Sequence, residues 1–169
     1  MAATYEPIAT QTLGSAAASV TFSSIPATYT DLIVIANMAV TTGTPNLQFY
    51  VNSDNAGTSY SGTVVVGNGS GALSNRFSNQ AQARVTYYAA LDTGFNSMWI
   101  FNFLNYANTT TNKTMLIRGG SVNSSGSEGT LENVSLWRST AAINSINISP
   151  TSSTFITGST FTLYGIKAA

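Results

Sequence analysis

The 169-residue chain has six acidic and six basic residues, no histidine and no cysteine. It therefore cannot build a serine–histidine–acid site, a cysteine nucleophile, a histidine- or cysteine-bound zinc or iron site, or a disulfide. Threonine, serine and asparagine make up more than a third of the residues, and charged residues only 7%, against roughly 25% in typical soluble domains. The near-zero net charge favours self-association.

The predicted elements are short strands with a period of two, separated by clusters of glycine, asparagine, serine and proline. Residues 1–18 are expected to form an extended N-terminal arm. Within it, residues 11–19 contain three consecutive alanines and are compatible with one helical turn. The first clear strand is predicted over residues 19–23, with Val20 and Phe22 on one face.

Two patterns follow in the chain. Residues 31–38 form a continuous apolar run, which predicts a central strand covered on both faces. Residues 46–52 alternate instead, with Leu47, Phe49 and Val51 on one side. The second pattern is typical of a strand with one face in the core.

The later strands are predicted at similar spacing, and residues 74–82 are compatible with a second helical turn. The strand over 97–106 has apolar side chains on both faces, with Trp99, Phe101 and Phe103 on one and Met98, Ile100 and Leu104 on the other. The remaining predicted strands are 62–67, 82–91, 113–118, 131–138, 143–149 and 160–167.

About ten short strands with turn signals every 8–12 residues predict an all-β, antiparallel two-sheet sandwich. A jelly-roll-like topology is favoured over a closed barrel, because several strands look buried on both faces. The glycine- and serine-rich segments 67–71 and 121–129 are expected to be loops. No linker or composition shift divides the chain, so a single domain over 1–169 is expected.

A paired-carboxylate site for glycoside hydrolysis needs two acids about 5–10 Å apart in a cleft. The sequence singles out no such pair. Asp31 and Asp92 stand at turn signatures, where a carboxylate usually accepts hydrogen bonds from turn amides, and Glu128 and Glu132 flank a glycine-rich loop and are expected to be solvated. The full set of candidates is Glu6, Asp31, Asp54, Asp92, Glu128 and Glu132. We predict no catalytic residues.

Metal and phosphate sites are also not predicted. Residues 52–57 resemble part of a calcium loop, but Ala56 stands at the fifth position and no acid at the twelfth, so an Asx-rich hairpin turn is favoured. The segment 67–71 lacks the Lys-Ser/Thr of a phosphate-binding loop, and no helix is predicted after it. We expect no metal ion and no cofactor.

Charge and hydropathy limit the partners. No cluster of lysine and arginine provides a surface for nucleic acid or anionic lipid. The longest apolar run, 32–36, is too short to span a bilayer, and residues 1–6 lack the basic and apolar regions of a secretory signal. We expect a protein made in a cytoplasm that binds neither nucleic acid nor membrane.

Tyrosine and tryptophan beside amides are typical of sugar-binding faces. Core or interface packing is favoured for Trp99 and Trp137, and Tyr60 is the best candidate for exposure, although a structural role is favoured for it too. The aromatic candidates are Tyr50, Tyr60, Tyr87, Tyr88, Trp99, Tyr106 and Trp137. Glycosylation-type triplets at Asn68, Asn108, Asn112, Asn123, Asn133 and Asn147 are expected from composition alone.

Motifs near both ends of the chain occur in a recognisable order. They are IATQTLG (8–14), SVTFSSIP (19–26), YTDL (29–32), LWRSTAAINSI (136–146) and GSTFTLYGI (158–166). In these motifs the chain resembles small virion structural proteins and tail-fibre end domains of tailed bacteriophages, including those of cyanobacteria. The resemblance covers nearly the whole chain, with a variable middle over about 37–133, and it identifies no catalytic or binding residues.

The resemblance implies a β-sandwich on a phage particle, commonly in threefold assemblies. We expect a free-standing, non-enzymatic capsid decoration or cement protein that forms a homotrimer and contacts the major capsid protein or another virion protein. The alternative is a receptor-binding protein of a tail fibre or tail tip that grips host-surface glycans. A third hypothesis, an enzyme that degrades cell-surface polysaccharide, needs converging carboxylates. In each case the protein is made in a host cytoplasm and displayed on the mature virion.

Overall fold

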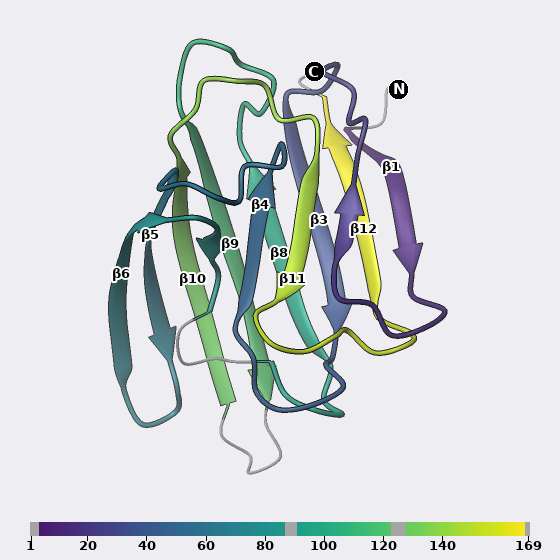
Figure 1. The fold of residues 1–169 in the computed structure, drawn as a ribbon, viewed down its shortest axis with the longest axis vertical. Helices are drawn as coiled ribbons and strands as arrows, with labels where there is room; N and C mark the ends of the chain where they lie inside the picture. The colour runs from purple at the N-terminus through teal and green to yellow at the C-terminus, as the bar shows by residue number, and fades with distance from the viewer. Residues whose placement is uncertain (1–3, 87–90, 123–127, 168–169) are drawn as a thin grey trace.

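The computed structural model describes residues 4–86, 91–122 and 128–167. In this part of the chain it contains twelve β-strands and no helix, so no helix there is long and apolar enough to cross a membrane. The strands form two antiparallel sheets that pack face to face (Figure 1). The predicted all-β two-sheet sandwich is thus confirmed.

The larger sheet has eight strands in the order β1-β12-β3-β8-β9-β10-β5-β6. Their bounds are β1 Tyr5–Thr12, β12 Thr160–Ile166, β3 Asp31–Met38, β8 Ser97–Phe103, β9 Lys113–Val122, β10 Glu128–Trp137, β5 Tyr60–Gly67 and β6 Ala72–Gln80. The smaller sheet has the order β2-β11-β4-β7. Its strands are β2 Val20–Phe22, β11 Ile146–Pro150, β4 Leu47–Val51 and β7 Ala83–Arg84. The chain crosses repeatedly between the sheets, as it does in jelly-roll arrangements.

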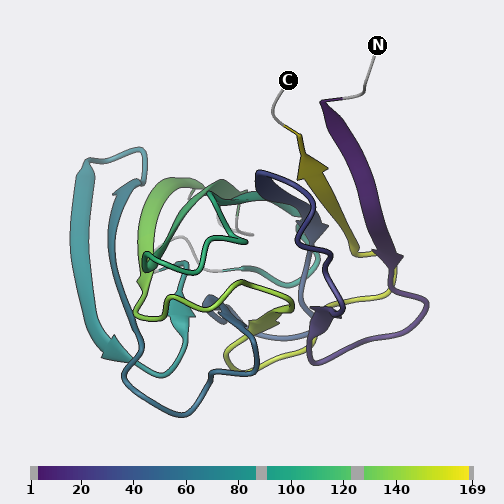
Figure 2. The ribbon, with the colours of Figure 1, turned by 90° about the horizontal axis from the view of Figure 1, so that it is seen from above.

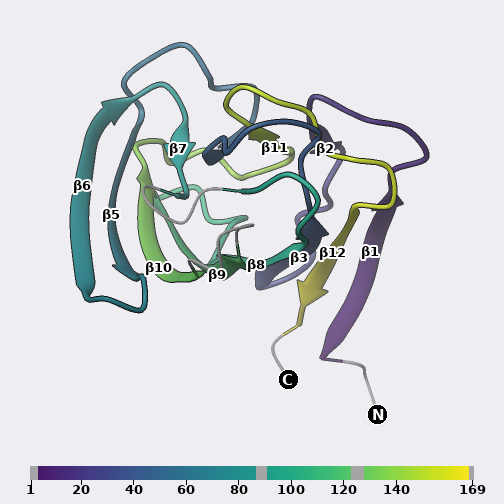
Figure 3. The same ribbon diagram turned by 90° about the horizontal axis from the view of Figure 1, so that it is seen from below.

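The two sheets differ in curvature and extent. Seen from above, the larger sheet curves around the smaller one (Figure 2). From below, β5 and β6 curve toward the side of the smaller sheet, whereas β1 and β12 diverge from it (Figure 3). The smaller sheet therefore covers one face of the larger sheet, and no second layer among the described residues covers the other.

Burial along β3 shows this one-sided covering at the level of residues. Leu32, Val34, Ala36 and Met38 are fully buried, whereas Ile35 is 41% exposed. The prediction that residues 31–38 are covered on both faces is therefore wrong. The strand is central and apolar on both sides, but only one of those sides lies against the smaller sheet.

The two sheets meet around the ring of Phe49 in β4. This ring stands edge-on to Tyr60 of β5 and to Phe101 and Phe103 of β8, with centroid separations of 6.4, 5.9 and 5.7 Å. Edge-to-face contacts add to the free energy of apolar burial. The Tyr60 hydroxyl accepts a hydrogen bond from the Val51 amide at 3.0 Å, so its polar end is satisfied inside the core.

Neither segment for which a helical turn was expected is helical. β1 pairs with β12, so residues 5–12 are extended as expected but lie in the sheet instead of forming a free arm, and no helix occupies 11–19. β6 pairs with β5 over most of 74–82. Both are edge strands with a neighbour on one side only. Few of their side chains are buried, which explains why their sequences show little apolar alternation.

Several predicted boundaries also differ. The strands predicted over 97–106 and 143–149 are β8 Ser97–Phe103 and β11 Ile146–Pro150. The predicted strand over 82–91 is represented by β7 alone, and its residues 87–90 lie outside the described part. β9 and β10 extend into the segment predicted as a loop over 121–129, of which 123–127 lie outside the described residues. The predicted hairpin tip at 67–71 is present between the paired strands β5 and β6. In this turn the Asn68 side chain accepts hydrogen bonds from the Ser70 and Gly71 amides at 3.1 and 2.9 Å.

Tyr29 fastens β1 and β12 where they diverge. Its ring covers Gly165 so closely that an added Cβ there would lie 2.3 Å from a ring carbon. The Tyr29 hydroxyl donates to the Glu6 carboxylate at 3.2 Å, and the Lys167 ammonium donates to the same carboxylate at 2.9 Å. This contact lowers the pKa of Glu6 and raises the pKa of Lys167. The group ties the first strand to the last.

We predict that Phe49→Ala destabilises the fold by about 3–5 kcal/mol, because it leaves a cavity between the sheets. The same change at Phe95, a loop residue that is 40% exposed, is expected to cost no more than about 1 kcal/mol. Urea unfolding followed by tryptophan fluorescence measures both. Equal losses for the two variants would contradict the central role of Phe49.

We also predict that Gly165→Ala costs about 1–3 kcal/mol, because the added methyl group displaces the Tyr29 ring. Gly14→Ala is the matched control, since no heavy atom beyond its chain neighbours lies within 4 Å of a Cβ built there. Thermal unfolding of both variants tests this. If Gly165→Ala melts with the wild type, the close packing of Tyr29 on Gly165 is wrong.

Candidate interaction surface

We call the uncovered face of the larger sheet the outer face. Its central row crosses five strands, in the order Ile35 of β3, Ile100 of β8, Arg118 of β9, Glu132 of β10 and Val65 of β5, each directly opposite the next. Side chains alternate between the two faces of a strand, and the residues on either side of these five along each strand point into the sandwich. The row therefore lies across the middle of the outer face.

Apolar side chains dominate the outer face around this row. Met98 is 60% exposed, Val65 53%, Val134 49% and Ile35 41%. Leu116 lies directly opposite Val134, and half-buried Ile100, Leu116 and Leu136 fill the spaces between the exposed residues. Contiguous exposed apolar patches mark interaction sites more often than apolar residues scattered singly.

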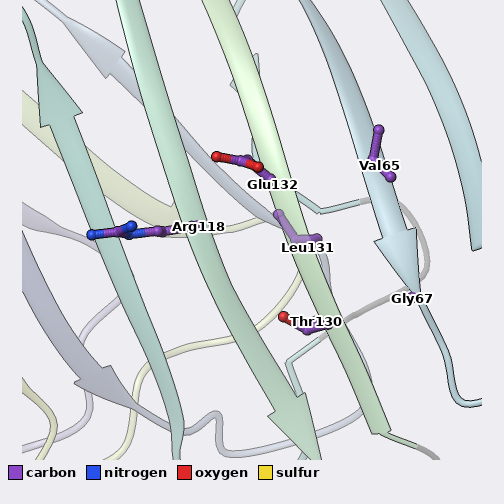
Figure 4. Close-up of a pocket in the computed structure, with 6 residues that line it drawn as sticks. All are labelled: Val65, Gly67, Arg118, Thr130, Leu131 and Glu132. Carbon is purple, nitrogen blue, oxygen red and sulfur yellow. The ribbon is translucent and has the colours of Figure 1, made fainter.

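Missing side chains at two glycines hollow the outer face. Met98, Gly120, Thr130 and Gly67 are successive cross-strand neighbours, so Thr130 stands between two positions without a Cβ. One open depression, shown in Figure 4, is lined by Val65, Gly67, Arg118, Thr130, Leu131 and Glu132. A second is lined by Met98, Ile100, Arg118, Gly119, Gly120 and Thr130. The outer face thus has apolar projections beside shallow hollows.

Opposite charges lie side by side at the centre of the outer face. Arg118 and Glu132 are direct cross-strand partners. Figure 4 shows that the Arg118 side chain extends away from Glu132, toward β8, while Glu132 extends toward β9. No hydrogen bond or ion pair joins their charged ends in the described part of the chain. Both side chains are exposed on the outer face.

Of the six candidate carboxylates, Glu128 and Glu132 share β10, and the other four lie on other segments. Four accept hydrogen bonds within the protein: Glu6 from Lys167, Asp31 from the Asn105 amide, Asp54 from the Trp137 indole nitrogen, and Asp92 from the Thr93 amide. Glu132 lies on the outer face, and the side chain of Glu128 is outside the described set. Among described residues, no group of three or more acids could hold a metal ion.

The calcium-loop-like segment 52–57 begins with a turn that holds a neighbouring loop. Asn52 and Ser53 have positive φ angles of 51° and 58°. The Asn52 side chain donates to the Ala142 carbonyl at 2.7 Å and accepts from the Asn144 amide at 2.8 Å. Its polar atoms are therefore engaged within the protein. The segment joins β4 of the smaller sheet to β5 of the larger sheet, so the prediction of a hairpin at this turn is wrong.

Most described aromatic candidates lie in the core. Tyr60, Trp99, Tyr106 and Trp137 are buried, and burial raises the pKa of the Tyr60 phenol. The ranking of Tyr60 as the best candidate for exposure is therefore wrong. The structural role that was favoured for it is confirmed, because its ring packs on Phe49. Tyr87 and Tyr88 lie outside the described residues. Tyr50 is half-buried in β4, directly opposite Asn147 of β11.

Several of the asparagine triplets have structural roles. Asn133 is fully buried and donates to the carbonyls of Arg84 and Val85 at 2.9 and 3.3 Å. Asn108 accepts hydrogen bonds from the Thr110 and Thr111 amides at 2.7 and 2.9 Å. Asn123 lies outside the described residues. These contacts fit the interpretation that the triplets reflect composition.

The sequence placed part of the outer face correctly, because Met98 and Ile100 were expected to face away from Trp99. It did not reveal that Arg118 and Glu132 adjoin. They are separated by the β9–β10 connection, and only the register of that hairpin makes them neighbours. The available signal for this neighbourhood was the opposite charge of two residues on strands that were predicted to be consecutive.

Comparisons with known proteins leave the family open. No protein-family model matches the chain, and no curated protein matches its sequence. Among solved structures, the galectin LEC-6 of Caenorhabditis elegans is similar over 94% of this chain and 96% of its own, with a TM-score of 0.36 and 9% identity.

Proposed function

We propose that the protein is a non-enzymatic structural protein of a phage particle, and that it assembles through the outer face of the eight-stranded sheet. The observation that carries this proposal is the exposed apolar surface of that face, which no second layer of the described chain covers. Burying apolar surface contributes about 25 cal/mol per Å² to association. An uncovered face of this kind gains free energy when another protein surface packs on it.

The distribution of charge supports the same proposal. Interface cores are depleted of charged residues and enriched in large apolar ones. At the centre of the outer face the described charged side chains are Arg118 and Glu132, which have opposite signs, and their row neighbours Ile100 and Val65 are apolar. Such a surface suits packing against protein more than against a polyanion.

The setting on a virion is supported by the resemblance of the two end motifs to phage structural proteins. In this proposal the protein packs against copies of itself and against the major capsid protein or another virion protein. The homotrimer implied by the resemblance stays a prediction. Its measure is the sedimentation coefficient of the purified protein at micromolar concentration.

We predict that Met98→Asp and Val134→Asp each shift the assembled protein toward the monomer, because burying a carboxylate in an apolar contact is costly. Both side chains are about half exposed or more, so the fold is expected to survive the changes. Phe95→Asp alters an exposed aromatic residue in the loop between β7 and β8 and is expected to leave assembly unchanged. Sedimentation velocity compares the variants. A wild type that stays monomeric under all conditions would exclude the proposal.

The alternative, a tail-fibre protein that binds host-surface glycan, has its best support on the other side of the molecule. Half-buried Tyr50 lies beside Gln48 and opposite Asn147 in the smaller sheet. However, the Asn147 amide already donates to the Thr21 hydroxyl at 2.7 Å. Copy number separates the two functions: gel densitometry of purified virions is expected to show many copies for a decoration protein and few for a fibre tip.

A further inference from the structure

We propose that the outer face binds the outer face of a second copy around a twofold axis, with Arg118 of each copy paired with Glu132 of the other. This inference rests on the proposed self-assembly. It names a second copy as the partner and a twofold dimer as the geometry, in place of the homotrimer that the resemblance implies. The axis lies between β9 and β10 and runs approximately along them. The choice of this axis follows from the sheet register. The register places pairs of outward residues at equal distances on the two sides of the line between β9 and β10.

The charged residues meet under this symmetry. A twofold rotation about a line between β9 and β10 places each outward residue of β9 over its cross-strand partner in β10 of the second copy. Arg118 and Glu132 are such partners, so two ion pairs form. An arrangement without this exchange would bury two charges next to apolar side chains, which is costly.

The apolar residues match under the same rotation. Leu116 meets its β10 partner Val134. One strand further out, residues of β8 meet residues of β5, and Ile100 therefore meets Val65. Apolar side chains thus face one another on both sides of the ion pairs.

The projections and hollows match as well. Met98, the most exposed large apolar residue of the face, meets Gly67. Gly67 lines the depression shown in Figure 4, which leaves room for the methionine side chain. Thr130 of one copy meets Gly120 of the other. Met98 and Thr130 therefore each lie over a position without a Cβ, and the surface is complementary to itself.

The curvature of the sheet permits this contact. β5 and β6 recede toward the smaller sheet, and β1 and β12 diverge from it (Figure 3). The rotation brings the diverging strands of one copy beside the receding strands of the other. Sheets that pack face to face keep their strands within about 30° of one another, and an axis near the strand direction satisfies this.

Charge exchange tests the pairing. Arg118→Glu alone and Glu132→Arg alone are each expected to weaken self-association by about tenfold or more, because like charges then face one another. The double variant Arg118→Glu/Glu132→Arg is expected to associate as the wild type does. Arg76→Glu on β6 makes the same change of charge where the proposed partner residue is Ile33, and is expected to have little effect. Sedimentation equilibrium gives the dissociation constants, and circular dichroism checks the fold.

Mixing tests the symmetry. An equimolar mixture of the Arg118→Glu and Glu132→Arg variants is expected to form a mixed dimer as tight as the wild-type dimer, because every facing pair then has opposite signs. In a head-to-tail ring of three copies, two variants cannot alternate, so at least one contact joins two copies of the same variant. Association of the wild type without recovery in the mixture would overturn the twofold arrangement.

Cross-linking tests the register independently of charge. The natural chain has no cysteine, so engineered thiols have no background. A Met98→Cys chain mixed with a Gly67→Cys chain is expected to be joined by a thiol-specific cross-linker that spans about 10 Å, the spacing of packed sheets. A Met98→Cys chain mixed with a Thr154→Cys chain is the control.

The outcomes separate this inference from the proposed function. A strictly monomeric wild type would end both. A wild type that associates while the charge variants associate equally well, or while Met98→Cys and Gly67→Cys are not joined, would overturn the pairing and leave assembly through the outer face standing.

Discussion

The structure depends on one mismatch: a four-stranded sheet covers one face of an eight-stranded sheet. Phe49 sets the contact by standing among Tyr60, Phe101 and Phe103, and the buried residues of both sheets form one cluster around it. Since no further layer exists in the described chain, every outward position of the larger sheet meets the surroundings. The apolar residues among them make the outer face the part of the molecule that gains most from a partner.

Polar groups elsewhere in the described chain are mostly engaged in holding the fold. Asp54 accepts the Trp137 indole hydrogen bond, Asn52 holds the loop over 142–145, and Glu6 ties the first strand to the last. The proposed role in assembly therefore rests on shape and apolar surface and requires no reactive centre.

Self-complementarity of the outer face arises from register alone. Antiparallel pairing places Arg118 opposite Glu132 and Leu116 opposite Val134, and a line between these strands relates residues of similar size or opposite charge. A shift of one residue in the β9–β10 hairpin would turn these side chains to the other face of the sheet. The same hydrogen bonds that stabilise the sheet thus determine which residues a second copy would meet.

The fold class, most of the strands and the inward face of several strands could be predicted from the sequence, because an alternation with a period of two is a property of each segment. Residues 46–52 and 97–103 show this clearly. Tertiary structure alone decided that residues 31–38 are covered on one side, that Tyr60 lies in the core, and that 5–12 and 72–80 are edge strands. It also decided that Arg118 adjoins Glu132 in the centre of an uncovered face. These features depend on how many strands each sheet contains and on which distant segments pair. The sequence pattern within one segment gives no information on either.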